Sequence, residues 1–288
     1  MRSFGFEKLT LITCFCLGTL SVAAQQSAED LTHYVDPLIG TKEMGHVFPG
    51  ACVPFGMVQL SPDTDTIPYA VNGAYNGKVY RYCAGYQYSD PTIVGFSHTH
   101  LSGTGHSDLA DFLVMPTVGD IHLNPGTAEK PEAGYRSRFK HETEKAEPGY
   151  YSVMLEDYKI KAELTTSTHV GFHQYTFPES DAAHIILDMN HGIYNYDGKV
   201  LWSYIRVEND TLVTGYRITS GWARTNYIYF AMVFSKPIKS YGGKNDEQLV
   251  YKGFWRKFDQ EHNFPEMAGK KLKAHFDFET AKGEKIKI

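Results

Sequence analysis

Apolar and polar positions alternate in short runs over the second half of the chain. The runs cover residues 150–155, 160–166, 170–177, 183–189, 199–207, 211–219 and 226–234. Alternation with a period of two is typical of a strand that buries one face. Glu208, Asn209 and Asp210 separate two of the runs and predict a hairpin turn. Short strands divided by turns predict an all-β fold, an antiparallel sandwich or barrel rather than a parallel α/β sheet.

Residues 34–134 differ from this half because Gly, Pro, Asn and Asp are frequent and the apolar pieces are short. Residues 57–60, 93–97 and 112–118 predict short strands joined by long loops. Loops of this length within a compact domain are usually functional.

The last residues carry a further strand pattern. Residues 272–278 predict a strand, Gly283 predicts a turn, and residues 284–288 begin a new alternation that stops with the chain. We therefore expect the chain to be truncated at its C-terminus.

The N-terminus has the order of an export signal. Arg2 and Lys8 supply positive charge at the start. An apolar run over residues 9–20 comes next, and four small residues that end at Ala24 follow it. This order predicts a signal peptide over residues 1–24, cleaved after Ala24. The run is too short to span a bilayer, so we expect no membrane span after cleavage. Residues 25–33 predict a flexible polar segment, and the mature protein is expected to be secreted or periplasmic.

Composition adds one exclusion and leaves two questions open. The net charge is −5 and no basic block occurs, so we expect no nucleic-acid partner. The chain has 20 tyrosines, which suit both pleated sheets and the faces of sugar rings. After signal cleavage only Cys52 and Cys83 remain, and one disulfide or two free thiols are both compatible with the sequence.

The densest cluster of chemically active side chains lies within residues 95–111. One hypothesis is a metal site, because a His-x-His pair on a strand presents two imidazoles on one face. His98 and His100 form that pair, and His106 or Asp108 would have to complete the ligand set.

Two other hypotheses explain the same segment. Ser102 and Thr104 carry hydroxyl groups, and Gly103 and Gly105 let the backbone approach a ligand closely, as a polyol-binding loop requires. Alternatively the histidines brace a structural turn. Spacing alone leaves these two hypotheses equally open.

Other catalytic patterns are missing from the sequence. No Gly-x-Ser-x-Gly nucleophile elbow and no P-loop occurs. Glycosidic hydrolysis needs one carboxylic acid and one carboxylate across the bond, and sequence spacing identifies no such pair. The carboxylates of the loop-rich half also suit ordinary turns: Asp63, Asp65, Asp90, Asp108 and Asp111.

Several segments in order resemble glycoside hydrolase family 92. The strongest is residues 95–105, which read Gly-Phe-Ser-His-Thr-His-Leu-Ser-Gly-Thr-Gly. The others are residues 35–41, 48–51, 54–63, 147–151, 171–178, 221–223 and 234–237. The resemblance covers nearly the whole mature chain.

This resemblance implies a calcium-dependent, inverting exo-α-mannosidase that acts on mannose-containing glycans. It implies an antiparallel β-sandwich followed by a helical barrel domain, which supplies the catalytic acid, the base and most of the calcium site. Residues 34–288 correspond to the sandwich domain alone. The resemblance therefore implies no catalytic residue and no metal ligand in this chain, which we expect to be inactive by itself.

The resemblance also implies where the two domains meet. We expect a substrate-binding or domain-interface role for six residues: His98, His100, Ser102, Gly103, Thr104 and Gly105. A stand-alone carbohydrate-binding module and a histidine-based metal-dependent hydrolase are the alternative functions. Three positions depart from the family pattern, with His106 in place of a Cys and His169 and Gln174 in place of basic residues.

Overall fold

Strands make up almost all of the regular structure in the computed structural model, which describes residues 30–103, 109–193, 196–246, 258–259 and 264–288. The chain forms two compact units, residues 1–34 and residues 35–288. In the first, the described residues contain one 3-10 turn, η1 (Thr32–Tyr34), and the Asp30 carboxylate accepts a hydrogen bond from the Thr32 amide at 3.0 Å. The sheets belong to the second unit.

The largest sheet has seven strands, all paired antiparallel, in the order β1-β2-β6-β7-β13-β20-β17. The strands are β1 (Ala51–Cys52), β2 (Gln59–Asp63), β6 (Gly95–Ser97), β7 (Leu113–Val118), β13 (Ser180–Asp188), β20 (Leu272–Thr280) and β17 (Ser240–Asn245).

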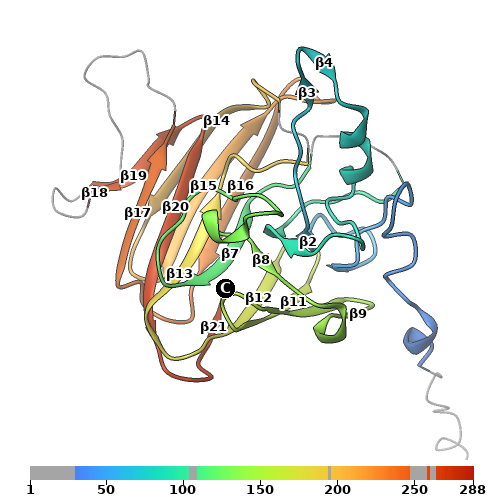
Figure 1. Cartoon of the computed structure of the whole chain (residues 1–288). Coiled ribbons are helices and arrows are strands. Elements are labelled where there is room, and N and C mark those ends of the chain that lie inside the picture. The colour runs from blue at the N-terminus through green and yellow to red at the C-terminus, as the bar shows by residue number, and fades with distance from the viewer. Residues whose placement is uncertain (1–29, 104–108, 194–195, 247–257, 260–263) are drawn as a thin grey trace, which may run out of the picture. The chain divides into compact units, whose positions relative to one another are not determined.

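Two further sheets have five strands each (Figure 1). One contains β21 (Lys285–Lys287), β12 (Gly171–Thr176), β11 (Ile160–Thr166), β10 (Tyr150–Leu155) and β9 (Lys145–Glu147). The other contains β16 (Asn226–Val233), β15 (Leu212–Thr219), β14 (Val200–Val207), β19 (Phe264–Gly269) and β18 (Phe258–Asp259).

Short elements complete the fold. They are the strand pairs β3 (Ala70–Val71) with β4 (Ala74–Tyr75) and β5 (Thr92–Ile93) with β8 (Ser137–Arg138), and the 3-10 helices η2 (Gly77–Tyr82), η3 (Pro131–Ala133) and η4 (His141–Thr143).

Both five-stranded sheets pack on the same face of the seven-stranded sheet, which we call its inner face. The strand register puts Phe96 and Phe276 on that face, because alternate residues of a strand point to opposite sides. The Phe96 ring lies 6.1 Å from the ring of Tyr175 on β12, and the Phe276 ring lies 5.4 Å from that of Phe234, which follows β16. One continuous apolar core therefore joins all three sheets, which makes the fold an antiparallel β-sandwich.

The opposite, outer face of the seven-stranded sheet carries polar side chains among apolar ones. Leu113, Met115 and Ile186 are fully buried on this face. The segment that follows β7 covers part of it, because the Tyr135 hydroxyl donates to the Asp188 carboxylate at 2.8 Å. Polar groups on this face are therefore desolvated and need partners.

The structure confirms the all-β prediction and most of the expected strands. The hairpin over residues 208–210 is also confirmed, since the Glu208 amide donates to the Leu212 carbonyl at 2.8 Å. The expected strand over residues 93–97 is instead divided at Val94, whose amide donates to the Asp63 carbonyl at 2.7 Å. The predicted signal peptide lies outside the described residues.

Sequence reasoning missed β17 because Gly242 and Gly243 suggest a turn. In the structure, these glycines allow close pairing with β20. A Cβ atom on Gly242 would lie 2.4 Å from the Nε2 atom of His275, which is closer than real contacts allow. Glycine at this position in the strand therefore leaves space for the side chain of the neighbouring strand.

Cys52 and Cys83 are free thiols in the structure, which decides between the two alternatives that the sequence left open. Cys52 is exposed and Cys83 is buried, and burial raises the pKa of the Cys83 thiol to about 11. Cys83 therefore behaves as a small apolar core residue.

Truncation of Phe276 tests the core that joins the sheets. We expect Phe276→Ala to lower the free energy of unfolding by about 3–5 kcal/mol, because the side chain is fully buried and leaves a cavity. Phe55→Ala is the matched control, since Phe55 is fully exposed, and should change it by less than about 0.5 kcal/mol. Urea denaturation measures both, and equal effects would contradict the assigned core.

Candidate functional site

Four loop segments gather at one end of the seven-stranded sheet. Antiparallel register brings together the ends of β6 and β13 and the starts of β7 and β20. The segments that leave or enter there are residues 98–103, 109–112, 189–193 and 270–271. They come from distant parts of the chain, so buried polar contacts have to hold them together.

Arg217 supplies the strongest of these contacts. It lies on β15, in the opposite layer of the sandwich, and its side chain is fully buried. The guanidinium donates to the Asp111 carboxylate from Nε at 2.9 Å and from Nη2 at 2.5 Å. Its Nη1 atom donates to the carbonyls of Met189 at 3.2 Å and His191 at 2.5 Å, and Nη2 also donates to the Ala110 carbonyl at 3.2 Å. One side chain thus ties the loops before β7 and after β13 to the second layer.

Asp63 forms a second buried centre at the end of β2. Its two carboxylate oxygens each lie 2.9 Å from an imidazole Nε2 atom, that of His100 and that of His191. Burial alone would raise the pKa of Asp63, but the two histidines outweigh burial and hold that pKa well below its usual range. Gly85 approaches so closely that a Cβ atom there would lie 2.1 Å from the carboxylate.

His100 holds both ring protons in this arrangement. Its Nε2 atom faces the Asp63 carboxylate and its Nδ1 atom lies 2.8 Å from the Gln59 carbonyl. Both oxygens only accept hydrogen bonds, so both nitrogens must donate. The His100 ring, engaged at both nitrogens, therefore fixes the start of the loop after β6.

His98 is held differently, as a neutral ring. Its Nδ1 atom lies 2.7 Å from the Phe112 carbonyl and therefore donates, which leaves Nε2 as an acceptor. The Nε2 atom of His173 donates to it at 2.9 Å, and the Tyr175 hydroxyl donates to His173 Nδ1 at 2.7 Å. Burial lowers the pKa of His98, and burial together with the neighbouring His98 holds the pKa of His173 well below its ordinary value.

The six residues expected at the site thus fall into three groups. His98 and His100 do not share one strand face, because β6 ends at Ser97 and the two rings engage different partners. Ser102 and Gly103 lie exposed at the tip of the loop, where the Gly103 amide donates to the His46 carbonyl at 2.8 Å.

Thr104 and Gly105 lie outside the described residues. So do His106 and Asp108, which the metal hypothesis for this loop requires, and that hypothesis stays a prediction.

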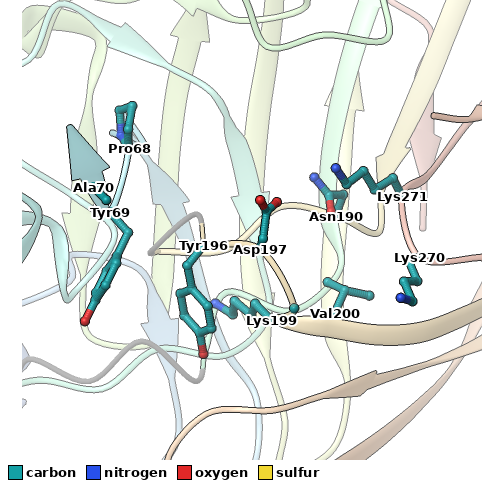
Figure 2. Close-up of a pocket in the computed structure, with 11 residues that line it drawn as sticks. Pro68, Tyr69, Ala70, Asn190, Tyr196, Asp197, Lys199, Val200, Lys270 and Lys271 are labelled. Carbon is teal, nitrogen blue, oxygen red and sulfur yellow. The ribbon is translucent and has the colours of Figure 1, made fainter. Parts of the chain in front are cut away.

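A pocket of about 730 Å³ adjoins the braced loops. Its lining residues are Pro68, Tyr69, Ala70, Asn190, Tyr196, Asp197, Gly198, Lys199, Val200, Lys270 and Lys271. Figure 2 shows the two tyrosines toward one side of the pocket and Asn190, Lys270 and Lys271 toward the other. The Tyr69 and Tyr196 ring centroids lie 5.5 Å apart. Aromatic faces beside amide and charged groups suit a polyhydroxylated ligand.

The pocket walls are tied to the same loops. Lys199 donates from Nζ to the Leu109 carbonyl at 3.2 Å, and the Thr66 hydroxyl donates to the Gly192 carbonyl at 3.0 Å. Sequence reasoning missed this pocket. The signal was present, because Tyr196, Asp197 and Gly198 combine an aromatic ring, a carboxylate and a turn between two strand patterns.

Solved structures resemble this fold over most of the chain. A family GH92 alpha-mannosidase from Bacteroides thetaiotaomicron, solved in complex with mannoimidazole, is 41% identical with a TM-score of 0.77, and the match covers 90% of this chain and 32% of that one. A family GH92 inverting mannosidase from Bacteroides thetaiotaomicron VPI-5482 is 26% identical with a TM-score of 0.64, over 89% of this chain and 30% of that one.

A curated relative, an uncharacterized secreted glycosidase from Arthroderma benhamiae, is 32% identical over 169 residues. That match covers 58% of this chain and 20% of the relative. The chain thus spans about a third of the solved enzymes and a fifth of the curated relative.

These likenesses place the chain among the β domains of glycoside hydrolases. The chain belongs to glycoside hydrolase family 92, because the model of the glycosyl hydrolase family 92 N-terminal domain matches residues 34–288. No helix among the described residues is long and apolar enough to cross a membrane.

Replacing Arg217 tests the bracing of the loops. We expect Arg217→Met to lower the free energy of unfolding by about 3–5 kcal/mol, because it leaves the Asp111 carboxylate buried without a counter-charge. Asp111→Asn in the same background should recover part of the loss by removing that charge. Arg224→Met, at an exposed position, is the matched control and should be nearly neutral in thermal or urea unfolding. A neutral Arg217→Met would contradict the bracing role.

The neutral histidine pair predicts a pH dependence of stability. The folded-state pKa values of His98 and His173 are lowered, so their contribution is complete above the unfolded value of about 6.5 and is lost as pH falls from there toward the folded values. We expect urea midpoints to fall between pH 8 and pH 5.5.

His173→Phe should lower stability at pH 8 but flatten this slope. His122→Gln, which changes an exposed histidine, should keep the slope of the unmodified chain. An unchanged slope in His173→Phe would show that other groups cause the dependence.

Proposed function

We propose that this chain is the N-terminal domain of a secreted or periplasmic α-mannosidase. The whole enzyme hydrolyses terminal α-mannosyl residues of glycans with inversion. Family membership together with 41% identity to a solved alpha-mannosidase, of which the chain covers 32%, is the observation that carries the proposal. Export is supported by the N-terminal signal pattern and by the secreted relative.

The catalytic acid and base belong to a second, helical barrel domain in this proposal. The described loops support this division of labour, because their buried carboxylates are already used. Asp63 is bound to two histidines and Asp111 to Arg217. Hydrolysis with inversion requires an acid and a base carboxyl about 6.5–9.5 Å apart, and a carboxylate held by buried cationic partners is poorly suited to either role.

The same side chains do not form a calcium site. Calcium takes six to eight oxygen ligands, and the carboxylates of the braced loops already accept from histidine and arginine nitrogens and from the Thr99 hydroxyl. In the proposed enzyme the calcium ligands come mostly from the second domain.

We propose that the segment from Ser102 to Gly105 contacts the glycan or the barrel domain. His98 and His100 then act as positioning residues that fix where this segment begins. Their buried rings support this role, since every ring nitrogen of both residues already has a partner.

A second candidate function is carbohydrate binding by this domain alone. The pocket beside Tyr69 and Tyr196 favours it, because the described residues of the chain form that pocket without a partner. The two candidates are compatible, and they differ in whether the chain needs a second domain to act on mannose.

Two measurements test the proposal. The coding sequence beyond the codon for Ile288 should encode a helical domain, and the full-length enzyme should release mannose of inverted anomeric configuration, observed by proton NMR. The purified chain should release none. Calcium-dependent release of mannose by the chain alone would overturn the division between domains.

Titration calorimetry with α-mannobiose tests the pocket. Tyr196→Ala should weaken binding about two- to tenfold, the worth of one aromatic contact. Tyr227→Ala, at an exposed position outside the pocket, is the matched control. Equal affinity in the two variants would show that the pocket does not bind the glycan. The proposed catalytic role of the whole enzyme would be unaffected by that result.

A further inference from the structure

Two histidines and an aspartate converge on the outer face of the seven-stranded sheet. His184 on β13 stands directly opposite Asp277 on β20, and His275 precedes Asp277 by two positions, so the three side chains leave the same face. The Nδ1 atoms of His184 and His275 lie 2.7 and 2.8 Å from the same Asp277 oxygen, Oδ1. Across the described residues, this is the one group of three His, Cys, Asp or Glu whose ligand atoms all lie within 4.8 Å of one another.

Residues outside the trio hold two of its remaining polar atoms, one on His184 and one on Asp277. The Nε2 atom of His184 lies 2.8 Å from the Gly119 carbonyl and donates to it. The Ser240 hydroxyl donates to the second carboxylate oxygen of Asp277 at 2.6 Å. Metal-binding histidines in proteins commonly donate their other ring N–H to a carbonyl, and metal-binding carboxylates are commonly hydrogen-bonded in the same way. These contacts orient two of the three ligands toward one point.

The side chains of the trio are mostly buried, but they are in part accessible to solvent. The exposed fractions of the side chains are 6% for His184, 15% for His275 and 16% for Asp277. The nearby Lys239 forms an ion pair with Glu279, so its charge is balanced. Solvent therefore reaches His275 and Asp277, as the entry of an ion requires.

We propose that His184, His275 and Asp277 form a binding site for a divalent cation of the zinc class. The two Nδ1 atoms and the Asp277 carboxylate supply three ligands, and water supplies the fourth. Two nitrogens and one oxygen match zinc, whereas calcium takes oxygen ligands almost alone. Ligands at 2.0–2.2 Å around a tetrahedral ion are about 3.4 Å apart, so each of the two Nδ1–Oδ1 distances needs to lengthen by roughly 0.6 Å.

Proton accounting gives the proposal a specific signature. In the metal-free arrangement both Nδ1 atoms donate to Asp277, and each must lose its proton to bind an ion. His184 keeps the proton on Nε2 for the Gly119 carbonyl. Zinc binding therefore releases the Nδ1 proton of His184, and the Nδ1 proton of His275 either leaves as well or moves to its Nε2 atom. Both strands stay in register, and the ion links the neighbouring strands β13 and β20.

The experiment uses the full chain, purified without a polyhistidine tag and stripped with a chelator. Titration calorimetry with ZnCl₂ should give one ion per chain with proton release, detected by comparing two buffers of different ionisation enthalpy. CaCl₂ should give no binding that competes with zinc. At a hundredfold excess of zinc over its Kd, the Tm should rise by about 5–10 °C.

Variants decide whether the trio is the site. His275→Gln should weaken zinc binding at least about tenfold and abolish most of the rise in Tm, while near-ultraviolet circular dichroism stays unchanged. Asp277→Asn should act likewise, and if it fails to fold the His275 variant decides. His122→Gln, at an exposed position, should bind zinc as the unmodified chain does. Absence of zinc binding to the unmodified chain, or equal binding by His275→Gln, would overturn the proposal and leave the trio as a hydrogen-bonded cluster.

Discussion

The buried pair of Arg217 and Asp111 is the contact on which the loop end of this domain depends. It crosses from the five-stranded sheet of β15 to the loops of the seven-stranded sheet, and no water-filled gap separates the partners. Removing two charges from water is costly, so such a pair stabilises only when every donor finds an acceptor. The guanidinium meets this condition by donating to three backbone carbonyls as well as to the carboxylate. The loops before β7 and after β13 are therefore held in a single arrangement.

Two histidines that are two residues apart show how strongly local partners set chemical state. His98 faces a carbonyl and another imidazole and stays neutral, with the tautomer fixed by the Phe112 carbonyl. His100 faces a carbonyl and a carboxylate and carries both ring protons. Neither ring has a free nitrogen. Both histidines position the loop after β6, because they anchor its start, while Ser102 and Gly103 are exposed to solvent.

The strands were predictable because a strand that buries one face has apolar and polar residues in alternation. Family membership was predictable from ordered motifs such as residues 95–105. The partners of the site residues were not, since Asp111 and Arg217 are 106 positions apart and nothing local links them. β17 was missed for a related reason, because its glycines fit the clearance that His275 needs on the neighbouring strand. Local pattern thus reports burial and turns, while long-range pairing of polar groups becomes visible only in three dimensions.

The place of β20 has a consequence for how the chain is made. Residues 272–280 lie between β13 and β17 in the seven-stranded sheet, and Phe276 fills the core beneath them. Its neighbour β13 is synthesised some ninety residues earlier. This separation follows from the pairing of Ser180 with Thr280 and of Asp188 with Lys273. Until β20 arrives, one edge of β13 is unpaired and the part of the apolar core that β20 fills is open, which is the condition under which β proteins aggregate. Pairing over such distances is also slow. The unpaired edge therefore persists from the synthesis of Asp188 until β20 is complete at Thr280. Chaperones that bind this edge should affect the yield of the domain more than its final stability.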